Sequence, residues 1–241
     1  MNEHTALAIS QTLQNSGPQA AERQLTVIGH EAGDDQLALI VQALLPGEVA
    51  AIVGEGDYTK PSIASHFVTP EQFLGALERF GARWGRLEGN MRSDLVSQMS
   101  QEVADFVFSV ILTGDESHRH ALVTALLADT LGQDVLILVA VGEVGCPEFL
   151  EDDVLDVGKA EKGTWQELFV EIEQIDHRGL LMLKMEILAL YSKEFDFGSG
   201  KQHPSWHFIN RTLKTMSRKA AEHVGQEKPA ETKADEVFAD V

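Results

Sequence analysis

The feature that most constrains the fold is the apolar segment from Ser117 to Gly145, near the middle of the chain. Its first half repeats alanine and leucine at helical spacing, and residues 135–141 (VLILVAV) are apolar without interruption. A segment this apolar must be covered on nearly all sides, because it has no polar face to turn toward water. The sequence therefore predicts a central apolar hairpin at 117–145, with the flanking amphipathic segments as its shell.

The conformation of residues 135–141 is not decided by periodicity, because the run is short and apolar at every position. Its β-branched residues favour a strand. A similar layout at 37–56, with an apolar helix, a Gly-containing turn and a second apolar segment, favours a helix and suggests stacked helical hairpins. We predict a mainly α-helical, multi-helix globular domain. Within this helical domain we expect a short strand pair at 24–30 and 135–141. The alternative is an α+β domain in which a short buried sheet includes 135–141.

Several helix starts are marked by capping residues. The segment Thr69-Pro70-Glu71-Gln72 combines an N-cap threonine, a proline at the first helical position and a glutamine that completes a capping box. Thr164 and Glu167 form a second capping box, which predicts a helix from 164 to about 174. In the central hairpin, Ser117 is predicted as the N-cap of the first helix and Gly132 as its end.

Residues 179–193 are rich in Leu and Met and predict another, buried helix. A last helix is predicted to begin at Pro204, with Leu213 and Met216 on its apolar face and Lys214, Arg218 and Lys219 on its basic face.

The composition along the chain divides it into three parts. Residues 1–22 are polar and rich in Ala and Gln, which predicts an N-terminal helical arm. Residues 23–224 form a single helical domain, divisible into lobes at 23–90 and 91–224. Residues 225–241 (GQEKPAETKADEVFADV) have the composition of a disordered acidic tail.

The charge of the chain limits its partners. Asp and Glu number 38 against 19 Lys and Arg, a formal net charge of −19. Such a charge repels nucleic acid and anionic membranes, so a partner is expected to be another protein with a basic surface. Cys146 is the single cysteine, which fits a reducing cytoplasm, and the N-terminus lacks the pattern of a secretory signal. No cofactor motif is present, and we expect no cofactor.

The acidic charge is concentrated after the central hairpin. Between residues 129 and 176 there are thirteen acidic residues and two lysines. Acidic and apolar residues alternate at 148–156, which suggests a docking surface with apolar anchors inside an acidic field. The predicted partner-binding residues are Glu148, Phe149, Leu150, Glu151, Asp152, Asp153 and Asp156.

The sequence favours an interaction protein over an enzyme. It contains neither a GxSxG motif, nor a phosphate-binding loop, nor a GxGxxG motif. We therefore predict a cytoplasmic adaptor, chaperone or regulatory subunit that binds a partner through an acidic, apolar-laced surface. Two alternatives remain open. An acidic chain can imitate DNA and inhibit a nucleic-acid-binding protein, and His203, His207 and His30 could join carboxylates in a metal-dependent enzyme.

Overall fold

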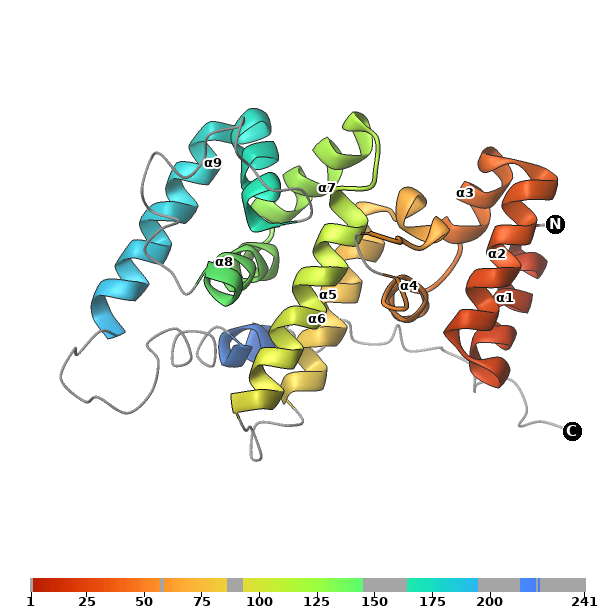
Figure 1. The fold of residues 1–241 in the computed structure, drawn as a ribbon, viewed down its shortest axis with the longest axis horizontal. Helices are drawn as coiled ribbons and strands as arrows, with labels where there is room; N and C mark the ends of the chain where they lie inside the picture. Colours follow the sequence, from red (N-terminus) through yellow and green to blue (C-terminus); the bar gives the residue numbers. More distant parts are fainter. Residues whose placement is uncertain are drawn as a thin grey trace, which may run out of the picture.

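The fold consists of a row of helices (Figure 1). The structure, a computed structural model, describes residues 2–56, 59–85, 93–144, 164–194, 213–219 and 221. Within these ranges every regular element is helical, and the mainly α-helical prediction is confirmed. In chain order the elements are α1 (Asn2–Ser16), α2 (Pro18–Ala32), α3 (Asp34–Gln42), α4 (Pro46–Val53), the 3-10 helix η1 (Ile63–Phe67), α5 (Pro70–Gly85), α6 (Ser93–Ile111), α7 (Glu116–Ala128), α8 (Thr130–Val144) and α9 (Trp165–Glu194).

The predicted strand pair is wrong at both of its strands, and the α+β alternative is wrong with it. Residues 135–141 belong to α8, and residues 24–30 belong to α2. Helix α2 begins at Pro18, directly after Gly17, whose φ of 83° is one that glycine adopts without strain. Leu25 is buried and Val27 is 52% exposed, although a strand would place both on the same face. The boundary that we drew between residues 22 and 23 falls inside this helix.

A buried glutamine connects α5 to α3. The predicted capping box is present, because the Thr69 N–H donates to Gln72 Oε1 and the Gln72 N–H donates to Thr69 Oγ1. The same Gln72 also donates through Nε2 to the carbonyl oxygens of Val41 and Leu44, at 2.8 and 2.7 Å. Val41 lies in the last turn of α3, where its carbonyl also accepts the Leu44 N–H at 3.0 Å, and Leu44 lies two residues beyond the end of the helix. One side chain therefore caps the start of α5 and connects it to the end of α3.

Aromatic side chains join α5 to α6 in the middle of the row. The Phe73 and Phe106 rings stack with their centroids 5.7 Å apart, and Phe80 contacts Phe106 at 5.3 Å. Phe73 and Phe106 are buried, as is Trp84 one turn beyond Phe80. This cluster forms the side of the core on which α7 and α8 pack.

The central hairpin consists of α7 and α8, which meet at a sharp turn. The N-cap of α7 is Asp115, whose Oδ1 accepts the His118 N–H at 2.8 Å, so the prediction of Ser117 as the cap is wrong. Helix α7 ends at Ala128, and Asp129 Oδ1 accepts the N–H groups of Leu131 and Gly132. Gly132 was predicted to end the first helix, but it lies in the first turn of the second, because Asp129 caps α8 before it.

In the described part of the chain, no single helix is long and apolar enough to cross a membrane. Helix α7 and residues 130–139 of α8 reach that length and composition only when they are taken together, and the two are bent by 105°.

Candidate functional site

Many of the residues that the sequence singled out lie outside the described part of the chain. These are the predicted partner-binding residues Glu148, Phe149, Leu150, Glu151, Asp152, Asp153 and Asp156, together with Cys146, His203 and His207. His30 is described and lies in the last turn of α2. Among the described residues, no group of three or more His, Cys, Asp or Glu side chains could hold a metal ion.

Helix α9 carries the first part of the site, and it is broken near its middle. Asp176 has φ −147° and ψ 81°, which interrupts the helix, and its Oδ1 accepts the Gly179 N–H at 2.9 Å. The two segments on either side correspond to the helices predicted from 164 to about 174 and from 179 to 193. In the first segment Leu168, Phe169 and Ile172 are fully buried against the core. The break lets the second segment take its own direction.

The second segment of α9 is apolar on more than one face. Leu180 and Leu183 are buried, whereas Leu181, Met182 and Met185 are 51%, 61% and 59% exposed. The sequence predicts a buried helix here, and this expectation is wrong for the exposed face. Met185 is four positions from Leu181 and three from Met182, so its side chain neighbours both of them on one side of the helix.

A groove runs between this face of α9 and the turn from α7 to α8. We call it the α9 groove, and it has a volume of about 580 Å³. Leu127 of α7 and Gln133 of α8 line one side, and Gln133 Nε2 donates to the Leu127 carbonyl at 2.7 Å. On the other side α9 contributes apolar and charged groups, namely Asp176, Arg178, Gly179, Met182, Leu183, Met185 and Glu186.

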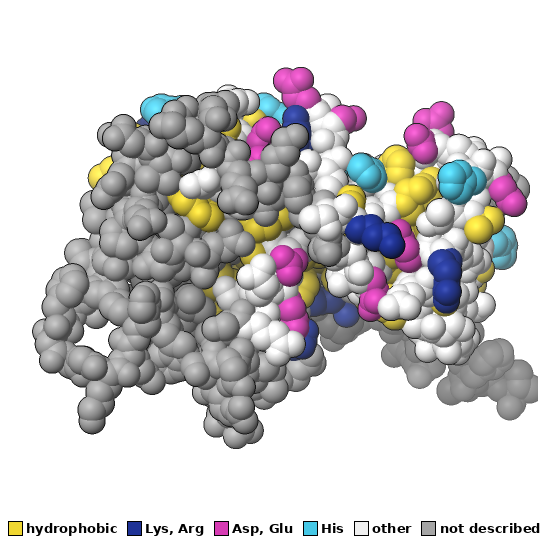
Figure 2. Space-filling model, in the orientation of Figure 1, with side chains coloured by type: hydrophobic (Ala, Val, Ile, Leu, Met, Phe, Trp, Pro, Cys, Tyr) yellow, Lys and Arg dark blue, Asp and Glu magenta, His cyan; other side chains and the backbone are white. Residues whose placement is uncertain are grey.

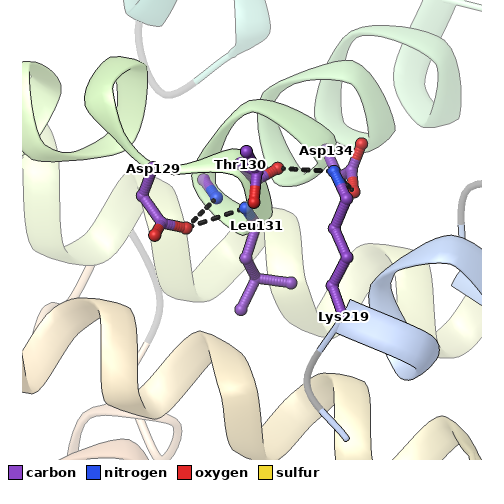
Figure 3. A network of polar contacts seen from close by, with 6 residues as sticks. Asp129, Thr130, Leu131, Asp134 and Lys219 are labelled. Carbon is purple, nitrogen blue, oxygen red and sulfur yellow. Dashed lines mark hydrogen bonds and ion pairs between the residues drawn. The ribbon is translucent and has the colours of Figure 1, made fainter. Parts of the chain in front are cut away.

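Next to the groove, α8 carries a carboxylate that is almost completely buried (Figure 3). Asp134 is 7% exposed, and its Oδ2 lies 2.6 Å from Lys219 Nζ. The same ammonium donates to the Thr130 carbonyl at 3.1 Å. Burial raises the pKa of Asp134, the hydrogen bond and charge of Lys219 oppose that rise, and the negative charge of Glu186 adds to it. Since Glu186 also lines the α9 groove, the buried carboxylate and the groove share one electrostatic environment.

Lys219 belongs to a short helical stretch that packs on the core near α8. In residues 213–219, Leu213 and Met216 are fully buried and Ser217 Oγ donates to the Leu213 carbonyl at 2.9 Å. The sequence predicts a helix here with Leu213 and Met216 on its apolar face, and this is confirmed for the described residues. It placed Lys219 on the opposite, basic face, whereas 25% of this side chain is exposed. The sequence feature that could have indicated this ion pair is Asp134, a single acidic residue directly before the apolar run 135–141.

A second titratable side chain lies at the start of α7. Burial lowers the pKa of His118, the charge of Asp115 opposes this change, His66 adds to it, and a hydrogen bond with the Ser65 backbone opposes it. Ser65 itself is fully buried and its hydroxyl donates to the Ser62 carbonyl at 2.7 Å. The Ser65 hydroxyl is buried and already hydrogen-bonded, and the Ser65 backbone bond to His118 links η1 to α7.

We expect the protein to lose stability through His118 as the pH falls. In the folded state the pKa of His118 lies below 6.5, so the unfolded chain takes up a proton first as the pH drops below that value. The free energy of unfolding should therefore decrease between pH 6.5 and the lower pKa of the folded state, and this contribution levels off below it. Urea unfolding at several pH values, compared between the wild type and His118→Asn, checks this. An equally steep decrease in both proteins would contradict the assignment.

The groove and the buried ion pair offer binding chemistry. They bring together apolar side chains, three carboxylates (Asp134, Asp176 and Glu186), the Lys219 ammonium and the exposed guanidinium of Arg178. Such a combination can hold an amphipathic segment, whose apolar face enters the groove while its charged groups meet the rim. No family model, no curated protein and no solved structure matches this chain.

Proposed function

We propose that the protein is a cytoplasmic interaction protein, an adaptor or regulatory subunit that binds an amphipathic, basic segment of another protein in the α9 groove. The observation that carries the proposal is the exposure of Leu181, Met182 and Met185 on a helical segment whose Leu180 and Leu183 are buried in the core. The single cysteine in 241 residues supports a reducing compartment.

The apolar face of α9 suits a protein partner. Each of its three large side chains is more than half exposed, and together they leave apolar surface in contact with water that a partner would cover. Methionine is unbranched and has a polarisable thioether, so it adapts to partner surfaces of different shapes. Figure 2 shows that exposed apolar side chains on the N-terminal helices lie beside Lys, Arg, Asp, Glu and His side chains.

The charges around the groove favour a basic partner. The groove is lined by two acidic residues, Asp176 and Glu186, and by one basic residue, Arg178. The chain as a whole carries a net charge of −19. The negative charge of the chain would therefore attract an apolar segment flanked by lysine or arginine, and the acidic residues of the groove would form ion pairs with those basic residues. The acidic residues from Glu148 to Asp156 would attract the same partner, and their role stays a prediction.

We expect the double substitution M182S/M185S to weaken the binding of a basic amphipathic peptide by about tenfold, because two apolar contacts are lost. The probe is a synthetic Leu/Lys peptide of about 16 residues, patterned as one amphipathic helix. Fluorescence anisotropy gives its dissociation constant with the full chain. Added salt should weaken the binding, since part of it is electrostatic.

Two controls separate groove binding from general attraction to an acidic protein. L7S/L39S removes two apolar side chains of similar exposure, 54% and 51%, from α1 and α3 and should leave the affinity unchanged. A scrambled peptide of the same composition keeps the charge but has no apolar face, and should bind weakly. Equal affinity of the two double variants for the amphipathic peptide would show that α9 is not the binding surface.

A further inference from the structure

We propose that residues 213–219 form a releasable cover, which occupies in cis a docking site for a basic amphipathic helix next to the α9 groove. The term lysine site is used here for Asp134 together with the Thr130 carbonyl. The inference rests on the proposed function for the chemistry of the competing partner. The inference concerns the contacts of the lysine site and not those of Met182 and Met185, so an experiment can contradict it while the proposed function holds.

The contacts of the cover are those of a helix bound in a groove. Leu213 and Met216 are three positions apart and fully buried, and Lys219, three positions further on, reaches the lysine site. Anchors at intervals of three and four residues along one face are how amphipathic helices are recognised by protein grooves. The chain therefore presents an example of the ligand that this surface accepts.

The lysine site makes the surface selective for a cation. Asp134 is 7% exposed and its close positive partner is the Lys219 ammonium, at 2.6 Å. A buried carboxylate without a cation is strongly unfavourable, so a purely apolar helix cannot replace the cover at low cost. An incoming helix must bring a lysine or arginine to the position that Lys219 holds.

The cover is built so that it can leave. The Lys219 side chain is still 25% exposed, while Lys214 and Arg218 are exposed on the outer face. Water and competing charges therefore reach the anchor from outside.

The lysine site adjoins the α9 groove, which gives the cover a consequence for binding. Gln133 lines the groove and Asp134 is the next residue, while Glu186 of the groove contributes its charge at Asp134. A basic partner that enters the groove therefore comes within reach of the lysine site and competes there with Lys219. The cover is an autoinhibitory contact, which a partner with a suitably placed base displaces.

The test uses a labelled synthetic peptide with the sequence of residues 205–221, added to the full-length chain. The wild type should bind this peptide weakly, because its own cover occupies the site. K219Q removes the anchoring charge from the cover in cis and leaves Asp134 free to pair with the peptide. We expect its affinity for the peptide to be about fivefold higher than that of the wild type or more.

Two double variants identify the lysine site. D134N/K219Q should lose the gain in affinity, since the carboxylate that pairs with the peptide is gone. D129N/K219Q removes a negative charge from the same end of α8 but should keep the gain in affinity. Asp129 bonds to the N–H groups of Leu131 and Gly132 and not to Lys219, and asparagine at this position still caps the helix. Thermal unfolding of each variant establishes that it is folded.

The result that overturns the inference is equal binding of the peptide by the wild type and K219Q, or by K219Q and D134N/K219Q. Adding M182S/M185S to K219Q separates this inference from the proposed function. If the gain in K219Q survives those substitutions, the lysine site acts even where the α9 groove is disabled. A failure of the Leu/Lys peptide to bind the wild-type groove would then count against the proposed function and leave the cover established.

Discussion

Replacing Gly132 by alanine should lower the free energy of unfolding by about 2–3 kcal/mol, as overpacking against a rigid neighbour does. A Cβ atom at this position would meet the carbonyl oxygen of Leu126 and lie 2.7 Å from its Cα. Both are backbone atoms of α7, and they cannot move without shifting Leu122 and Leu126, which are fully buried. The close approach of the two helices at their 105° bend therefore requires glycine.

A second glycine provides the matched control. Gly29 also lies inside a helix, but a Cβ there would meet the ends of the Leu37 and Ile63 side chains, at 3.0 and 3.2 Å. These side-chain ends can rotate, and alanine favours the helix over glycine by about 0.5–1 kcal/mol. Gly29→Ala should consequently change stability little. Urea unfolding followed by far-UV circular dichroism compares the two, and an equal effect would contradict the role given to Gly132.

Replacing Gln72 by glutamate should destabilise the protein by about 3–4 kcal/mol at neutral pH. The substitution keeps the shape of the side chain but exchanges the amide that donates to the Val41 and Leu44 carbonyls for an acceptor. A negative charge would then be held beside two carbonyl oxygens at a position that is 5% exposed. Both hydrogen bonds would be lost, and with them the connection to the end of α3.

The loss of stability in this variant should be smaller at acidic pH. Burial favours the neutral form of the new carboxyl group, so its pKa is raised in the folded state and protonation relieves the charge as the pH falls. A protonated carboxyl can donate one of the two hydrogen bonds. The difference in unfolding free energy between the variant and the wild type should therefore be smaller at about pH 5 than at about pH 7.5.

Gln101→Glu is the control for this substitution. Gln101 is exposed, and its amide donates to Asp105 one turn away on α6. The same change there places two carboxylates at i and i+4 in water, which costs about 0.5 kcal/mol. Chemical denaturation of both variants at the two pH values is the measurement. A loss at residue 72 as small as that at residue 101 would contradict the bridging role of Gln72.

The sequence predicts best where the signal is local. The Thr69–Gln72 capping box and the mainly helical class needed no knowledge of distant contacts. Residues 135–141 resisted prediction because a run that is apolar on every side has no periodicity to measure. In the structure this run is helical, and the helix begins after Asp129, which directly follows the last residue of α7 and caps α8 with its side chain.

The candidate site was less predictable for physical reasons. Leu181, Met182 and Met185 lie in a helical segment that is apolar on more than one face, and sequence alone does not tell which of these faces remains uncovered. The pair between Asp134 and Lys219 joins parts of the chain that are far apart, so spacing gives no indication of it. Asp134 was visible as an isolated acid, but its partner was assigned to the exposed side of its helix.

The distance along the chain between the lysine site and its occupant has a consequence for biosynthesis. Lys219 donates to the carbonyl of a residue 89 positions earlier. At a translation rate of about 5–20 residues per second, roughly 4–18 s pass between the synthesis of the two. During that interval the nascent chain holds the carboxylate of Asp134 without the ammonium that will neutralise it. The ribosome therefore delivers this surface first in its uncovered form, and the completed polypeptide closes it.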